Sequence, residues 1–134
     1  MPSHPLTCTR RIEFDAAHRV MGHEGKCKHV HGHRYALEAT FAATKELDSI
    51  GRIVDFGVIK ELLGQWIDEH WDHNAILFDK DKPLGKSIAD STGQTVFLPT
   101  QQSDRRKHGR IPNAHSRRPL NRSFRKLTIR YRYV

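Results

Sequence analysis

The chain has 134 residues, two cysteines and a formal net charge of +8 at pH 7. This length fits one domain with at most a small appendage, and two cysteines exclude a small scaffold held together by disulfides. No apolar run approaches the ~18 residues of a membrane span, and the first residues lack the apolar stretch of a signal peptide. We therefore expect a cytoplasmic protein that does not enter a membrane.

The positive charge is confined to the last quarter of the chain. Residues 1–100 hold 12 Lys and Arg against 14 Asp and Glu, whereas residues 101–134 hold 11 against 1. Eight of the ten histidines, by contrast, lie before residue 100. We predict one domain over residues 1–100, followed over 101–134 by a basic tail without a domain of its own.

Two segments show the period of two that is typical of strands with one wet face. Apolar residues occupy even positions from Thr7 to Ala16 and odd positions from His31 to Ala43. The residues between the two predicted strands, 18–30, are polar and indicate a loop.

A turn signal at 48–51 and a short extension at 52–55 precede a predicted helix from about Phe56 to His70. Asp55 is the expected N-cap of this helix. After Trp71, Pro83 and the glycines up to position 93 favour a loop, which ends in a brief apolar run over 96–99. The apolar stripe of the helix, at a spacing of about 3.6 residues, comprises Ile59, Leu62, Leu63, Trp66 and Ile67.

Three histidines continue the apolar parity of the two strands. His18 extends the even positions of the first strand, and His31 and His33 share the odd positions of the second. Residues i and i+2 of a strand lie ~6.6 Å apart on one face, from which two imidazoles can converge on one ion. A third imidazole would complete a zinc site with one position open, as catalytic zinc requires.

Two further features suggest proton transfer. Cys27 lies between two lysines, four residues before His31, and a cationic neighbourhood favours the thiolate form of a cysteine. Asp72 and His73 follow the predicted helix, and in such a pair the carboxylate can orient and charge the imidazole.

Each of these features alone has a simpler interpretation. A lone histidine on an apolar face is usually a hydrogen-bonded core residue, and His23 and His29 show that this region is rich in histidine. Asp72 and His73 could form a solvated helix end. Cys27 could be the fourth ligand of a closed structural zinc site instead of a base or nucleophile.

Four segments, taken in order, resemble the 6-pyruvoyl-tetrahydropterin synthase family. They are FDAAH at 14–18, CKHVHGHRY at 27–35, GRIVDF at 51–56 and WDHN at 71–74. The C-x-x-x-H-G-H spacing resembles the bacterial branch of the family, the 6-carboxy-5,6,7,8-tetrahydropterin synthases of queuosine biosynthesis. The resemblance covers about residues 7–98.

The resemblance implies an α+β tunnelling fold, in which two helices lie between the second and third strands of a four-stranded antiparallel sheet and the chains form trimers or hexamers. It implies a lyase that converts 7,8-dihydroneopterin triphosphate to 6-carboxy-5,6,7,8-tetrahydropterin, with release of acetaldehyde and triphosphate. A pyruvoyl-forming activity is the alternative. The implied Zn²⁺ ligands are His18, His31 and His33, and the implied catalytic residues are Cys27, Asp72 and His73.

The resemblance stops near residue 100, so the second helix and the last two strands of the family are not recognisable. A back-translation of residues 103–115, when read one nucleotide later, encodes PTAENMAEYLMR, the helix start that the family should show there. We therefore expect a frameshift, an exposed sheet edge where the third strand should pair, and weak or absent activity. The rival interpretation is a structural-zinc protein whose basic tail binds RNA, although the tail carries no recognised nucleic-acid motif.

Overall fold

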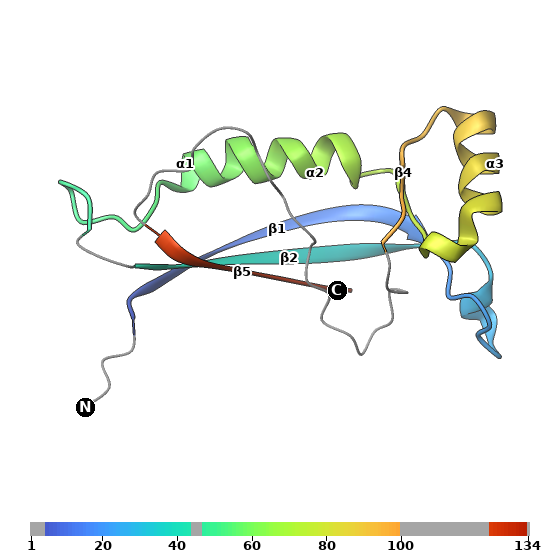
Figure 1. The fold of residues 1–134 in the computed structure, drawn as a ribbon, viewed down its shortest axis with the longest axis horizontal. Coiled ribbons are helices and arrows are strands. Elements are labelled where there is room, and N and C mark those ends of the chain that lie inside the picture. The colour runs from blue at the N-terminus through green and yellow to red at the C-terminus, as the bar shows by residue number, and fades with distance from the viewer. Residues whose placement is uncertain (1–4, 44–46, 100–123, 134) are drawn as a thin grey trace.

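The structure, a computed structural model, describes residues 5–43, 47–99 and 124–133. Its architecture is α+β, as expected: a helical segment runs along one face of a mixed sheet, and a further helix lies at one end of that sheet (Figure 1). Among the helices of these residues, none combines the length and the apolar character needed to cross a bilayer.

Strands β1 (Thr7–His18) and β2 (His31–Ala43) confirm the two predicted strands. They pair antiparallel in an unbroken register that places Phe14 opposite Tyr35. Directly opposed residues share a face of the sheet, so the even positions of β1 and the odd positions of β2 form one apolar surface. This surface supplies most of the core and ends at the histidines.

The predicted helix is present as three consecutive pieces, α1 (Phe56–Ile59), the π-helical η2 (Lys60–Gly64) and α2 (Gln65–His70). Asp55 is its N-cap, because its carboxylate accepts a hydrogen bond from the Gly57 amide at 2.6 Å. The apolar side of the helix packs on the sheet. The buried cluster includes Phe14, Ala16, Tyr35, Leu37, Ala39, Phe41, Ile59, Ile67, Trp71 and Ile76.

The expected loop after Trp71 is wrong in one part, because residues Lys82–Thr92 form helix α3. The proline that suggested a loop lies in the first turn, where no amide hydrogen bond is lost. Gly85 is buried against β4, and a Cβ added there would lie 3.1 Å from Val96 Cγ1. Gly93 ends the helix in the left-handed conformation that favours glycine. Proline and glycine usually interrupt the interior of a helix. Here Pro83 lies in the first turn, Gly85 permits close packing on β4, and Gly93 ends the helix.

The sheet also differs from the four-stranded antiparallel sheet that the resemblance implies. Two short strands, β3 (Ala75–Ile76) and β4 (Val96–Phe97), add parallel pairs beside β1, and the strand order is β4-β3-β1-β2-β5. Two-residue strands carry no period that a sequence pattern could reveal, which is why β3 was not expected.

The edge of β2 is covered, contrary to the prediction of an open edge. Strand β5 (Phe124–Tyr133) pairs antiparallel with β2, from Tyr35 opposite Tyr133 to Ala43 opposite Phe124. The C-terminal residues thus contribute one strand to the sheet. In this segment an apolar or aromatic residue occupies every second position, namely Leu127, Ile129, Tyr131 and Tyr133. Most of the predicted basic tail, residues 101–123, lies outside the described residues.

Candidate metal centre

Three imidazoles converge where β1 ends and β2 begins. The register places His18 opposite His31 and Ala16 opposite His33, so the three rings share the helix-covered face. Their potential ligand atoms all lie within 4.8 Å of one another. The Nε2 atoms of His18 and His31 are 3.2 Å apart, close to the about 3.3 Å that Zn–N bonds of about 2.0–2.1 Å impose on two ligands of a tetrahedral zinc. The donor set fits Zn²⁺ and leaves the fourth tetrahedral position to another ligand.

On its core side, the cluster packs on buried aromatic residues. Tyr35 is fully buried, and its ring centroid lies 6.2 Å from that of His18 and 6.4 Å from that of His33. Phe14 stacks on Tyr35 at 5.2 Å. His18 is only 1% exposed, whereas His31 and His33 are partly exposed. The cluster is therefore closed on the core side and open on the other.

The environment favours the neutral form of His18 and orients the ring of His31. Burial, and then the neighbouring imidazoles of His31 and His33, lower the pKa of His18 to about 4. His31 Nδ1 lies 2.7 Å from the backbone oxygen of His29, to which it donates its proton. That hydrogen bond leaves the Nε2 lone pair of His31 facing the cluster, as is usual for a metal-binding histidine.

Cys27 lies in the loop that connects β1 and β2. It is the central residue of the 3-10 turn η1 (Lys26–Lys28), its thiol is free and partly buried, and its backbone oxygen accepts a hydrogen bond from Val20 at 2.8 Å. Among the described residues, the group of possible metal ligands holds the three histidines without Cys27. The structure thus favours a three-histidine site over a closed site with one cysteine.

Asp72 and His73 form a pair directly after the long helical segment. One carboxylate oxygen of Asp72 accepts a hydrogen bond from the Asp15 amide at 2.9 Å, and the other lies 2.8 Å from His73 Nδ1. The hydrogen bond to Asp72, and then its negative charge, raise the pKa of His73. The side chain of His73 is 80% exposed, so its Nε2 faces solvent.

His73 adopts an unusual backbone conformation, with φ of 55°. A residue other than glycine in the left-handed region costs on the order of 1–3 kcal/mol, and such residues concentrate at functional sites. Here the backbone amide of His73 donates to the Asp15 oxygen at 2.7 Å, and its carbonyl accepts from Gln94 Nε2 at 2.8 Å. These contacts hold the conformation in place.

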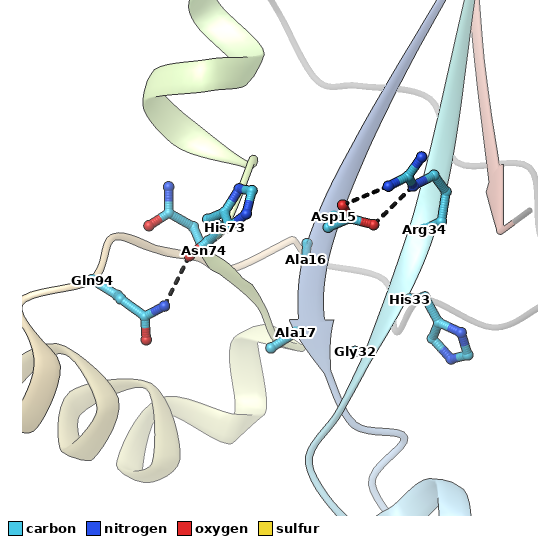
Figure 2. Close-up of a pocket in the computed structure, with 9 residues that line it drawn as sticks. All are labelled: Asp15, Ala16, Ala17, Gly32, His33, Arg34, His73, Asn74 and Gln94. Atoms are coloured by element: carbon cyan, nitrogen blue, oxygen red, sulfur yellow. Dashed lines mark hydrogen bonds and ion pairs between the residues drawn. The ribbon is translucent and has the colours of Figure 1, made fainter.

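A pocket of about 400 Å³ lies beside this pair. Gln94 and His73 line one side, and Arg34 paired with Asp15 lines the other (Figure 2). Figure 2 also shows His73 on one side of β1 and the ring of His33 beyond β2 on the other side, although both residues border the pocket. In this view the paired strands β1 and β2 lie between His73 and the ring of His33.

Two contacts around these sites have no counterpart in the sequence analysis. Arg19, next to His18, donates two hydrogen bonds of 2.6 Å to Asp81, which is 3% exposed at the end of η3 (Asp79–Asp81). Gln94 holds the carbonyl of His73. Both contacts join residues more than 20 positions apart, and no spacing rule links such pairs. The only available signal was Asp81, two residues before the proline of α3.

The chain is similar to a known protein family and to several of its members. The sequence profile of the 6-pyruvoyl tetrahydropterin synthase family matches residues 7–109. The 6-carboxy-5,6,7,8-tetrahydropterin synthase of Rickettsia bellii is 54% identical over 92 residues, and that of Rickettsia felis is 51% identical over the same length. These alignments cover 69% of this chain, and the chain spans 66% of the length of each of these two relatives.

More distant relatives show similarity in sequence and in structure. A 6-pyruvoyl tetrahydrobiopterin synthase of Dictyostelium discoideum is 29% identical over 107 residues, which cover 72% of this chain and 77% of that protein. Among solved structures, an uncharacterised protein of Wolinella succinogenes is 27% identical with a TM-score of 0.51, over 67% of this chain and 56% of that one. The likeness therefore extends to the fold.

Proposed function

Because the chain belongs to the 6-pyruvoyl tetrahydropterin synthase family, we propose that it is a zinc-dependent carbon–carbon lyase. In this proposal 7,8-dihydroneopterin triphosphate is converted to 6-carboxy-5,6,7,8-tetrahydropterin, with release of acetaldehyde and triphosphate. The observation that carries the proposal is the convergence of His18, His31 and His33 on one point at the rim of the core.

His18, His31 and His33 would hold the zinc. A neutral three-histidine set leaves the full +2 charge on the ion, which lowers the pKa of substrate hydroxyls and supplies several kcal/mol of stabilisation to developing negative charge. The chain's own contribution is to keep these imidazoles neutral and oriented. Burial favours the neutral form of His18, and the hydrogen bond to the His29 carbonyl orients the ring of His31.

The remaining residues would move protons. We assign Cys27 and His73 as the groups that take and return protons at the substrate, and Asp72 as the residue that orients His73 and stabilises its protonated form. The hydrogen bond from His73 Nδ1 to Asp72 supports this assignment because it directs Nε2 outward and raises the pKa of His73.

The carboxy-forming reaction is favoured over the pyruvoyl-forming one. The relatives that are 51–54% identical are named 6-carboxy-5,6,7,8-tetrahydropterin synthases, whereas the Dictyostelium protein with a pyruvoyl name is 29% identical. Analysis of the pterin product separates the two reactions. The carboxy-forming activity would place the protein in queuosine biosynthesis and in the cytoplasm.

Self-association would complete the site. The strands β1 and β2 lie between His73 and the ring of His33 of one chain, which favours action of His73 at the three-histidine cluster of another copy. We therefore propose trimers or hexamers with shared sites. Mixing His33→Ala and His73→Ala variants after joint refolding should restore part of the turnover that each variant lacks, and no gain would contradict shared sites.

The C-terminal segment bears on how active this chain is. We propose that a frameshift near residues 98–104 has replaced the last part of the family's domain, and that the chain consequently assembles poorly and turns over weakly. Sequencing the coding DNA across this segment tests the frame, and a confirmed uninterrupted frame would refute the frameshift.

One experiment tests the activity. This chain and its frame-restored form are each incubated with zinc and 7,8-dihydroneopterin triphosphate, and acetaldehyde is measured. We expect robust release from the restored form and weak release from this chain. No release from either form would refute the lyase proposal, whereas equal release would show that the altered tail does not disable the enzyme.

A further inference from the structure

We propose that Gln94 is a positioning residue for His73, whose left-handed backbone it holds so that the imidazole keeps one direction. The inference rests on the proposed function, in which His73 moves protons. It concerns a residue outside the motifs that carry the family resemblance.

His73 is the only residue other than glycine with a positive φ among those that the structure describes. Three hydrogen bonds hold it there: its amide donates to Asp15, its ring Nδ1 pairs with Asp72, and its carbonyl accepts from Gln94. The first two reach His73 from the side of β1, since the carboxylate of Asp72 is itself bound by the Asp15 amide. The third hydrogen bond comes from Gln94, which holds the carbonyl of His73 from outside β1.

Gln94 is itself held firmly enough to serve as a tether. It follows Gly93, the left-handed residue that ends α3. The Thr92 hydroxyl lies 3.0 Å from Gln94 Oε1 and accepts the Gln94 amide proton at 3.2 Å. The Thr92 hydroxyl also lies 2.7 Å from the Ile88 carbonyl, so its one proton is shared between that oxygen and Gln94 Oε1. The His73 carbonyl can only accept, and Gln94 Nε2 therefore donates to it, as Figure 2 shows.

A purely structural tie and a positioning role make different predictions. If Gln94 only joined the end of α3 to the strand, its loss would lower stability and leave the chemistry of His73 unchanged. If it fixes His73, its loss lets the backbone leave the left-handed region and loosens the hydrogen bond to Asp72. The pKa of His73 then falls toward 6.5, because Asp72 makes the largest contribution among the acidic groups near the ring, ahead of Asp15 and Asp68.

The test uses Gln94→Met in the full chain, a change that keeps the size of the side chain and removes the donor. The control is Gln65→Met, at an exposed glutamine that donates to Glu69 at 3.2 Å on α2. The titration of His73 is followed by ¹H–¹³C NMR of its Cε1–H group, and kcat, KM and zinc affinity are measured alongside. We expect Gln94→Met to lower the pKa of His73 and to reduce kcat roughly ten-fold. We expect KM and zinc affinity to stay unchanged, and Gln65→Met to change none of these.

A second variant keeps the proposal testable if Gln94→Met does not fold. Thr92→Val keeps Gln94 but removes the hydroxyl that orients its amide, so it should shift the pKa of His73 in the same direction by less. An unchanged His73 titration in both variants, with the fold intact by circular dichroism, would overturn the proposal. Absence of acetaldehyde release from both this chain and its frame-restored form would refute the proposed function alone, since the titration result does not depend on turnover.

Discussion

The molecule uses histidine in two regions with opposite environments. At the end of β1 and β2, the imidazoles crowd together above buried Tyr35, and burial lowers the pKa of His18 to about 4. At the other side of β1, the ring of His73 is 80% exposed, and the carboxylate of Asp72 raises its pKa. The first environment favours a neutral ligand, and the second favours a group that carries a proton.

The difference shows how one residue type serves two purposes in one small domain. Groups whose surroundings move their pKa values apart are often those that divide acid, base and ligand roles among themselves. Here the division follows from the sheet: the end of its helix-covered face gathers the proposed ligands, and the loop at its edge presents the proposed proton carrier. The predictions below test whether the two regions are chemically independent.

The largest expected effect is the loss of metal in His33→Ala. Removal of groups that only support a ligand already costs about 10–100-fold in metal affinity, so loss of a ligand should weaken zinc binding by more than about 100-fold. Competition with a chromogenic chelator measures this. The matched control is His29→Ala, because the backbone carbonyl of His29 contacts His31, and the substitution leaves that carbonyl in place. Zinc affinity that survives His33→Ala would show that the cluster is not the metal site.

The next effect separates catalysis from metal binding. Cys27→Ala should leave zinc affinity unchanged and lower acetaldehyde release by the frame-restored chain about 10²–10⁴-fold, the usual contribution of a general acid or base. Cys8→Ala, at the other cysteine, is the control. Loss of zinc in Cys27→Ala would instead favour a closed structural site with one cysteine ligand.

The three-histidine cluster could be anticipated because a strand repeats every two residues. His18, His31 and His33 carry the apolar parity of their strands, and the observed register of β1 and β2 brings the same three rings together. The long helix and its Asp55 cap were likewise accessible, because a periodic stripe and an adjacent capping residue are local signals.

The contacts that hold these residues were not accessible in this way. Arg19 and Asp81 lie 62 positions apart, and His73 and Gln94 lie 21 apart, so each pair meets only through the packing of α3 and the short strands. Helix α3 itself was missed because Gly85 is required by its close contact with Val96, which a single sequence does not reveal. Local patterns predicted the three-histidine cluster and the Asp72–His73 pair, and tertiary packing supplied the contacts that hold neighbouring residues in place.

A smaller effect is expected at the exposed region. Asp72→Asn removes the negative charge that raises the pKa of His73, so the limb of the pH–rate profile set by His73 should move to lower pH. Turnover by the frame-restored chain should fall about 10–100-fold, less than for loss of a proton-transferring group. Zinc affinity should not change. A profile that keeps its position would show that His73 does not set this limb.

The smallest effect concerns the scaffold that both regions share. Asp55→Ala removes the N-cap of the helical segment that ends just before Trp71, and should lower the free energy of unfolding by about 1 kcal/mol in a urea titration. Asp55→Asn should cost far less, because asparagine also caps helices well. Neither substitution touches the histidine cluster or the Asp72–His73 pair, so zinc affinity and the titration of His73 should match the wild type. A change in either one would show that the helix transmits strain to that region. The two histidine environments would then be coupled through the core instead of being set by their immediate neighbours.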